Sequence, residues 1–118
     1  MLQLMRLSQD LDEKQREWVR EGFQNQQQMT VFEMLFKDTL SPSEIRKVKS
    51  VCIEMVSAIE ERLSQMVHWT EKEETRSQVW TIVRNEAYKL PESSYPDDVL
   101  DRCIKQIYGY FYSRDLAA

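Results

Sequence analysis

Glycine and proline are scarce in this sequence, with two glycines and three prolines among 118 residues. Sandwiches and barrels need turn residues about every ten positions, so the scarcity argues against both. Long helices with short connections need few of them. The length suits one domain with a modest core and is too short for two. We therefore expect an all-α fold, a single compact domain of about five helices with no sheet.

Several catalytic and metal-binding motifs are also missing. The only histidine, His68, has no marked partner for nucleophilic catalysis, and Cys52 and Cys103 form no C-x-x-C pair. A catalytic residue and a zinc site are therefore not expected. Both glycines are isolated, which excludes a phosphate-binding G-x-x-x-x-G-K-[ST] loop. We expect no metal and no cofactor in this chain, and we interpret the two cysteines as buried thiols.

The sequence has no signal peptide and no apolar run near the roughly 20 residues of a membrane span. A cytoplasmic protein without a membrane partner is therefore expected. Positive charge is not in excess either, since 16 Lys and Arg face 20 Asp and Glu, giving a net charge of −4. Free-standing nucleic-acid binders are usually basic, so this balance counts against one, while a local basic patch in a larger assembly stays compatible with it.

The N-terminal part is predicted to be a helix over residues 8–28, with an apolar stripe between charged residues. The glutamine run at 24–28 is expected to end this helix. Residues 1–28 would thus be an N-terminal helix or a linker to an upstream region, and residues 29–118 the helical C-terminal domain. The stripe consists of Leu11, Trp18, Val19 and Phe23.

Two further helix starts carry capping residues. In "MTVFEMLFKD", Thr30 is expected to cap a short helix, with Glu33 completing a capping box. In "LSPSEIRKVK", Ser41 caps, Pro42 takes the first helical position and Glu44 the third. The short helix is expected to lie centrally in the core through Val31, Phe32, Leu35 and Phe36. The longer one has an apolar seam of Ile45, Val48, Cys52, Met55, Ile59, Leu63 and Met66.

The C-terminal half predicts two more helices separated by the loop "PESSYPDD". Thr70 is expected to cap the first of them, with Glu73 closing a capping box. The second starts at Pro96 or Asp97, with acidic residues in its first turn, where the helix dipole favours them. Its inner residues are Val99, Leu100, Cys103, Ile104, Ile107, Tyr108 and Phe111, with Tyr110 and Tyr112 at the edge.

A basic row with one tryptophan marks the stretch "HWTEKEETRSQVWTIVRNE". Lys72, Arg76, Trp80 and Arg84 follow one another at intervals of four. The row turns by about 40° per step, so Lys72 begins near the apolar stripe and Arg84 ends outside it. Guanidinium groups beside an indole suit phosphate or protein contacts. Alternatively, Arg76 pairs within the helix and Trp80 covers the core edge.

Three more cations crowd the start of the helix that follows Pro42, namely Arg46, Lys47 and Lys49. Helix N-termini prefer anions, so these cations do not serve helix stability, and an external anionic partner would explain them. A solvated face paired with the acidic first or last helix is the alternative.

Residues 40–112 resemble the C-terminal end of the restriction subunit of type I restriction–modification enzymes. The resembling features are "LSPSEIRKVK", "WTEKEETRSQV", "YPDD" and a closing helix that ends in tyrosines. The resemblance implies a non-catalytic helical domain of an ATP-dependent motor and site-specific deoxyribonuclease. Nuclease activity, ATP and Mg²⁺ would belong to other domains of that subunit.

The implied partners are the methyltransferase and specificity subunits of the same complex and double-stranded DNA. Matching positions of the pattern W-x-x-K-x-x-T-R-x-x-V are Trp69, Lys72, Thr75, Arg76 and Val79. Lys72 and Arg76 are the contact candidates, followed by Arg84, Trp80 and the three cations after Pro42. Two alternatives stay open. One is a protein-interaction module without DNA contact, and the other is a stand-alone helical regulator that dimerises through its Met/Phe-rich second helix.

Overall fold

The computed structural model describes residue 20 and residues 22–117. These residues form four α-helices: α2 (Gln26–Leu35), α3 (Pro42–Leu63), α4 (Glu73–Ala87) and α5 (Asp97–Ala117). A single 3-10 turn, η1 (Trp69–Glu71), lies between α3 and α4. No strand occurs in this part of the chain, which confirms the all-α prediction. Most of the helix predicted from residue 8 onward lies outside the described residues.

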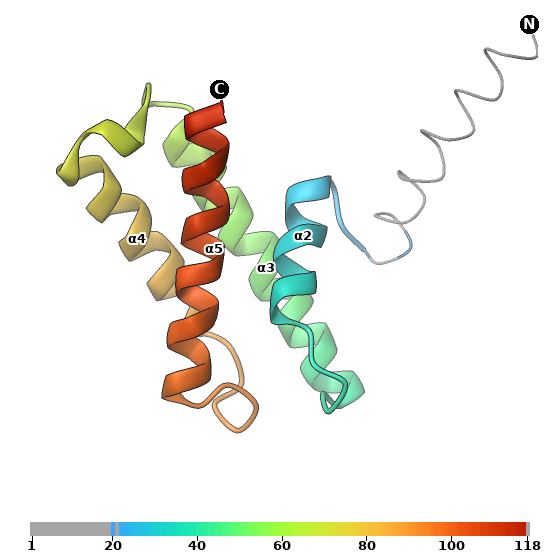
Figure 1. Ribbon diagram of the computed structural model, residues 1–118. Coiled ribbons are helices and arrows are strands. Elements are labelled where there is room, and N and C mark those ends of the chain that lie inside the picture. The colour runs from blue at the N-terminus through green and yellow to red at the C-terminus, as the bar shows by residue number, and fades with distance from the viewer. Residues whose placement is uncertain (1–19, 21, 118) are drawn as a thin grey trace, which may run out of the picture.

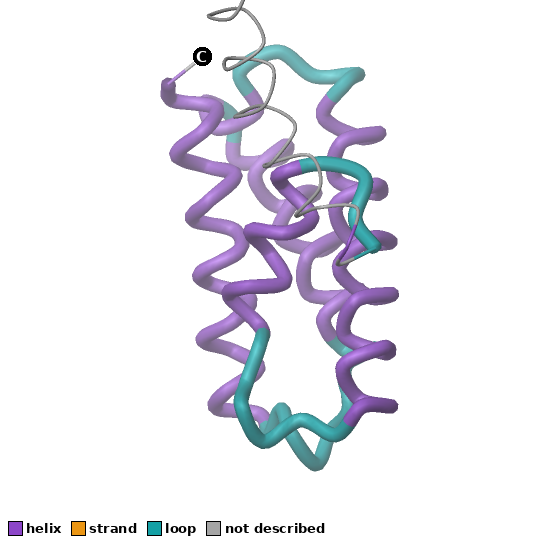
Figure 2. The backbone as a smooth tube through the Cα atoms, turned by 90° about the vertical axis from the view of Figure 1, so that its right-hand side faces the viewer, coloured by secondary structure: helices purple, strands orange, loops and turns teal. Residues whose placement is uncertain are grey.

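The four helices form an antiparallel bundle in which each packs on two neighbours. α2 packs on α3, α3 on α4, α4 on α5, and α5 returns to α2 (Figure 1). In the side view of Figure 2, the axes of these helices are roughly aligned with one another. Connections between consecutive helices are short, as the scarcity of turn residues requires. α2 is the short member, with 10 residues against 22 in α3 and 21 in α5.

The start of α2 differs from the prediction. Asn25 is the N-cap, and its side-chain oxygen accepts a hydrogen bond from the backbone N–H of Gln28 at 3.0 Å. Thr30 therefore lies inside the helix, where its hydroxyl donates to the carbonyl of Gln26. The predicted end of a helix in the glutamine run is wrong. Asparagine caps as well as threonine does, and glutamine is a good helix former, so the run starts a helix instead of ending one.

The end of α2 corrects a second prediction. Leu35 is the last helical residue, and Phe36 has extended backbone at the C-cap. Phe36 is 43% exposed, although Val31, Phe32 and Leu35 are buried as predicted. The helix stops one residue before the fourth core position, so the Phe36 ring turns towards solvent.

The start of α3 has the predicted capping box. The Ser41 hydroxyl accepts from the Glu44 N–H at 3.2 Å, and the Glu44 carboxylate accepts from the Ser41 N–H at 3.1 Å. Pro42 occupies the first helical position. From there α3 lines the core through the predicted seam, while Ile45, Leu63 and Met66 lie half-buried at its ends. Its buried residues are Val48, Val51, Cys52, Met55, Val56 and Ile59.

Both thiols are free and buried, as predicted. Burial raises the pKa of Cys52 to about 12. Burial also raises the pKa of Cys103. The neutral thiol is the stable form of each, so both behave as small apolar core residues.

The loop between α4 and α5 is fastened to the α2–α3 corner. The Tyr95 hydroxyl, on a side chain only 2% exposed, donates to the carbonyl of Leu35. Ser94 donates its hydroxyl to Glu44, and its carbonyl accepts from the Lys37 ammonium. These contacts close one end of the bundle and hold α5 against α2.

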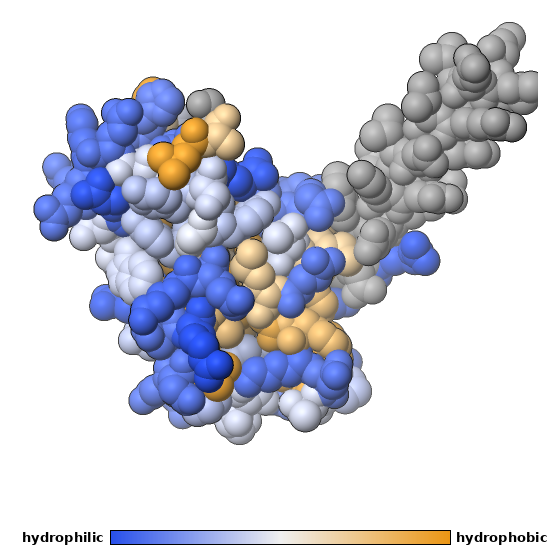
Figure 3. Space-filling model, in the orientation of Figure 1, coloured by the Kyte–Doolittle hydropathy of each residue, from blue (hydrophilic) through white to orange (hydrophobic). Residues whose placement is uncertain are grey.

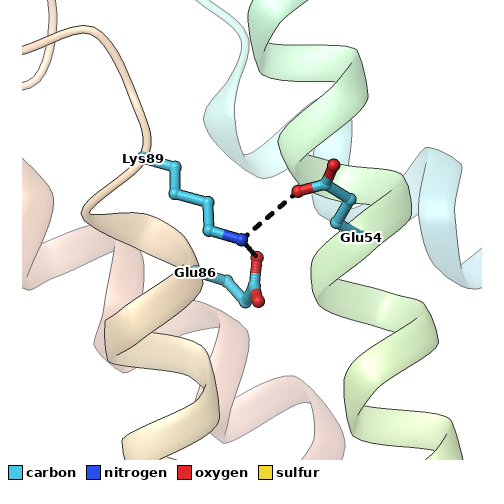
Figure 4. Close-up of polar contacts among 3 residues, drawn as sticks. All are labelled: Glu54, Glu86 and Lys89. Atoms are coloured by element: carbon cyan, nitrogen blue, oxygen red, sulfur yellow. Dashed lines mark hydrogen bonds and ion pairs between the residues drawn. The ribbon is translucent and has the colours of Figure 1, made fainter.

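α3 and α4 are also bridged on their outer side. The Lys89 ammonium lies 2.8 Å from Glu86 and 3.4 Å from Glu54 of α3 (Figure 4). The hydrogen bond with Glu86 and the two negative charges raise the pKa of Lys89 above its ordinary value. Lys89 and Glu54 are both exposed, so the ion pair between them contributes little to stability.

Candidate interaction surface

The connection between α3 and α4 positions the start of the predicted basic row. His68 lies in this connection, exposed as expected, with left-handed backbone at φ 50°. η1 follows, and Lys72 is the N-cap of α4 with extended backbone and no capping side chain. Thr70 does not cap α4, so that prediction is wrong. A separate turn stands between Thr70 and the helix, and the Thr70 side chain is used elsewhere.

Thr70 is fixed by the last turn of α5. Its N–H and hydroxyl donate to one carboxylate oxygen of Asp115, at 3.3 and 2.5 Å. Its carbonyl accepts from the Arg76 guanidinium at 2.6 Å. The Thr75 hydroxyl donates to the carbonyl of Trp69. The corner is therefore tied to both α4 and α5, and Arg76 is one of the ties.

Four aromatic rings lie next to this corner, along the contact between α4 and α5. Tyr108 is central, with its ring centroid 5.6 Å from Trp69, 5.3 Å from Trp80 and 5.9 Å from Tyr112. Trp69 also meets Tyr112 edge-on at 5.8 Å. Trp69 is only 3% exposed, whereas the other three are half-buried and reach the surface. Such pairs add about 0.5–1.5 kcal/mol each beyond burial, so the cluster helps to hold α4 and η1 against α5.

Arg76 lies close to this cluster. Burial raises the pKa of the Tyr108 hydroxyl, and the positive charge of Arg76 opposes that shift. The guanidinium thus donates to the Thr70 carbonyl and lies near enough to the tyrosine for its charge to act on it. Because one N–H group of Arg76 is already used by Thr70, the guanidinium cannot offer all its donors to an external partner.

The basic row spirals out of the core as its spacing predicts. Arg76 and Trp80 are half-buried, and Arg84 is exposed. Lys72 is exposed too, but it precedes the helix and does not continue the helical row. We call the residues along this face the α4–α5 surface. It consists of Lys72, Arg76, Trp80, Arg84, Tyr108 and Tyr112.

The cations of the α4–α5 surface form no ion pair with a carboxylate in the described part of the chain. The pairs among the described residues are those of Lys89, Arg102 with Asp98, and Lys105 with Asp101. None of them involves Lys72, Arg76 or Arg84. Lys72 does have acidic sequence neighbours, which are the exposed Glu71, Glu73 and Glu74. The positive part of the surface is therefore the stretch from Arg76 to Arg84.

The other predicted cations lie elsewhere. Arg46 and Lys47 are exposed and Lys49 is half-buried, all on α3. The Lys49 ammonium lies 5.6 Å from the ring centroid of Phe32 on α2. This places Lys49 on the α2 side of the bundle, so it does not join the basic row of α4.

Tyr108 was expected to face the core, and Tyr112 only to lie at an edge. Their spacing of four on α5 already puts both on one flank. The sequence did not predict that this flank contacts Trp80 and Trp69, because that contact depends on how α4 and α5 pack.

Within the described residues, no group of three or more His, Cys, Asp or Glu side chains is placed to hold a metal ion. No helix in that part of the chain has both the length and the apolar character needed to cross a membrane. No family model, no curated protein and no solved structure matches the chain.

Proposed function

We propose that this chain is a non-catalytic helical C-terminal domain of the restriction subunit of a type I restriction–modification enzyme. In this role it assembles with the methyltransferase–specificity core and contributes to DNA binding while the parent subunit translocates and cleaves DNA. ATP and Mg²⁺ would act in other domains of that subunit, and the complex would be cytoplasmic. The α4–α5 surface is the proposed contact.

The positions that carry the resemblance support this proposal, because they build one local unit. Val79 is fully buried, and Thr75 ties the first turn of α4 to Trp69. Arg76 ties the same turn to Thr70. The residues of the resembling pattern therefore hold the corner that presents Lys72 and the aromatic cluster.

One observation carries the proposed contact: exposed and half-buried cations beside surface-reaching aromatic rings, without an ion pair to any described carboxylate. Protein interfaces are enriched in Trp, Tyr and Arg, and such residues dominate their binding energy. Guanidinium and ammonium groups also suit phosphate contacts, which position a protein on DNA without reading its sequence. Trp80 and Arg84 are the residues best placed for either contact.

The test changes Lys72 and Arg84 to Ala in the full restriction subunit and measures two quantities. These are assembly with the methyltransferase core, by native mass spectrometry, and DNA binding at low salt, by fluorescence anisotropy. Arg76 is left intact because it also holds the fold. The proposal predicts that assembly, DNA binding or both are weaker in this variant than in the wild type. Two exposed cations of α5 that do not belong to this surface serve as the matched control, in the variant Arg102→Ala, Lys105→Ala. Unaltered assembly together with unaltered DNA binding would remove the proposal.

A second candidate is an assembly domain that makes no DNA contact. The acidic residues beside Lys72 favour it, since Glu71, Glu73 and Glu74 would repel phosphates near that end of the surface. Trp80, Tyr108 and Tyr112 would then be the anchors. Titrating the complex with salt separates the two candidates, because phosphate contacts weaken steeply as salt rises. Loss of assembly in Trp80→Ala with unchanged DNA binding supports the second candidate.

A further inference from the structure

A hollow of about 320 Å³ lies at the end of the bundle that holds the last turns of α3 and α5. Its inner wall is apolar and includes Leu63 of α3, Trp69 of η1 and Phe111 of α5. Trp69 and Phe111 are only 3% and 2% exposed, so this wall is part of the core. We call this space the Trp69 hollow. It includes none of the residues of the α4–α5 surface, so it has no role in the proposed function.

Two carboxylates line the Trp69 hollow from different helices. Glu60 belongs to the last turn of α3 and Asp115 to that of α5, and both are half-buried. One Asp115 oxygen accepts both hydrogen bonds from Thr70. One Glu60 oxygen accepts from the amide nitrogen of Gln27, in the amide orientation that satisfies both of its ends. Each carboxylate therefore keeps a second oxygen to which no residue of the described chain donates.

The charges around the hollow favour a cation. Among the described residues that line it, Arg114 is the cation, and it offsets one of the two carboxylates. Its guanidinium donates to the Gln27 oxygen at 2.9 Å and lies 5.6 Å from the ring centroid of Tyr110. The C-terminal turns of α3 and α5 add negative charge through their dipoles, against one positive N-terminal turn, that of α2. The balance at the hollow is therefore negative.

Exposed apolar side chains adjoin residues that line the hollow. Val67 is 86% exposed and follows Met66, and Leu116 is 67% exposed and follows Asp115. Figure 3 shows apolar side chains at the surface where α5 ends. A small amine would leave Val67 and Leu116 in water, whereas a protein segment can cover them. Exposed apolar side chains around a polar site are typical of protein contacts.

A lysine side chain matches both parts of this site. Its methylene stem suits the apolar wall, and its ammonium is a compact charge with three rotatable donors. The two open oxygens belong to different carboxylates, Glu60 and Asp115, on different helices. A planar guanidinium prefers both oxygens of one carboxylate, so an ammonium fits this arrangement better than an arginine side chain does.

We propose that the Trp69 hollow binds a lysine side chain of a partner protein, with its ammonium between Glu60 and Asp115 and the apolar neighbours of that lysine on Val67 and Leu116. The shared chemistry is that of an alkylammonium group, which a free amine also supplies, so the test includes both sources. The proposal does not rest on the proposed function.

NMR titration of the full chain with defined probes tests the proposal. The probes are a short synthetic peptide with one lysine between leucines, the same peptide with norleucine in place of the lysine, and butylamine. We expect the lysine peptide to move the amide resonances of residues 60–66 and 111–115. The norleucine peptide should bind about tenfold more weakly, because it has no charge for the two carboxylates.

Variants of the rim identify the two carboxylates. Glu60→Gln and Asp115→Asn each remove a negative charge but keep an oxygen that accepts from Gln27 or Thr70. The lysine peptide should bind each of them about tenfold more weakly than the wild type. Glu61→Gln is the matched control, because Glu61 is exposed and does not line the hollow. Circular dichroism checks that each variant keeps its helical content.

The variant Val67→Ser, Leu116→Ser identifies the source of the ammonium. Both side chains are exposed, so the fold should not change, and the lysine peptide should bind more weakly while butylamine binds as before. Butylamine that binds as tightly as the lysine peptide would contradict a protein partner. Equal binding of the lysine and norleucine peptides would overturn the ammonium site. The absence of resonance changes at millimolar lysine peptide would overturn the whole proposal.

Discussion

At the scale of single residues, the two arginines of the basic row have different roles. Arg76 is half-buried, donates to the Thr70 carbonyl at 2.6 Å and lies near Tyr108. Arg84 lies two turns later and is exposed. Each step of four residues rotates the row by about 40°, so identical residue types move from the bundle edge into solvent. Spacing alone predicts the rotation, but not that Arg76 would meet a carbonyl.

Replacing each arginine by alanine should separate these roles. Arg76→Ala is expected to lower the free energy of unfolding by about 1.5–3 kcal/mol, because a charge-assisted hydrogen bond to Thr70 is lost. Arg84→Ala should change it by no more than about 0.5 kcal/mol, as for other surface positions. Urea denaturation followed by circular dichroism measures both. Equal stability of the two variants would show that the Thr70 contact does not hold the corner.

Tyr95 offers a second test at this scale. Its hydroxyl is buried and donates to the Leu35 carbonyl at the end of α2. Tyr95→Phe leaves that carbonyl without its donor, so the free energy of unfolding should fall by about 1–3 kcal/mol. Tyr88→Phe is the matched control, because Tyr88 is 61% exposed and should be neutral. A neutral Tyr95→Phe would contradict the role of this hydroxyl in closing the bundle.

At the scale of elements, the helices start in three different ways. α3 has the full capping box of Ser41 and Glu44, α2 has Asn25, and α4 has no side-chain cap at Lys72. The first turn of α4 is instead held by Arg76, whose guanidinium donates to the Thr70 carbonyl. Local sequence was sufficient for α3, where Ser41 and Pro42 fix the first helical residue, and for α5, which begins at the predicted Asp97. At α2 the cap is Asn25, five residues before the predicted Thr30, and α4 begins without a side-chain cap.

The capping box of α3 predicts a pH dependence. Hydrogen bonds from Ser94 and from the N–H and hydroxyl of Ser41 lower the pKa of Glu44 below its ordinary value of 4.5. A lowered folded-state pKa means that the charged form stabilises the fold above pH 4.5, and that this contribution is lost as pH falls below it. Wild type should therefore lose more stability than Glu44→Gln between about pH 6 and pH 3.

Thermal unfolding across that pH range measures the difference. The midpoint of Glu44→Gln should lie below that of wild type at neutral pH, and the two should converge in acid. Glu92→Gln, which alters an exposed carboxylate in the α4–α5 loop, should run parallel to wild type. A gap between wild type and Glu44→Gln that stays constant with pH would contradict the assigned hydrogen bonds.

At the scale of the whole molecule, an acidic bundle presents a small cationic and aromatic face. The net charge of −4 opposes binding of the isolated chain to DNA, whereas the α4–α5 surface carries three cations that form no ion pair with a described carboxylate. Both facts fit a domain that acts inside a larger assembly, where other subunits supply most of the attraction.

This balance predicts how the isolated chain behaves. Its binding to duplex DNA should be undetectable near physiological salt and weak at low salt, because the overall charge repels phosphates. If Lys72 and Arg84 contact phosphates in the full complex, their removal should reduce the slope of log affinity against log salt by about 2. Fluorescence anisotropy over a salt series measures the slope. An unchanged slope favours the assembly domain without DNA contact.

The sequence by itself determined the helical class, the core seam of α3, its capping box and the outward rotation of the basic row. These properties follow from spacing and from residues within one turn of each other, so no distant contact is needed to predict them. The tertiary structure decided where α2 begins and ends, that Phe36 lies outside, and that Arg76 serves Thr70. It also brought Tyr108 and Tyr112 of α5 against Trp69 and Trp80. Those outcomes depend on which helix flanks meet across the bundle. Hydrophobic spacing predicts which face of a helix is buried, but not which other helix packs on that face.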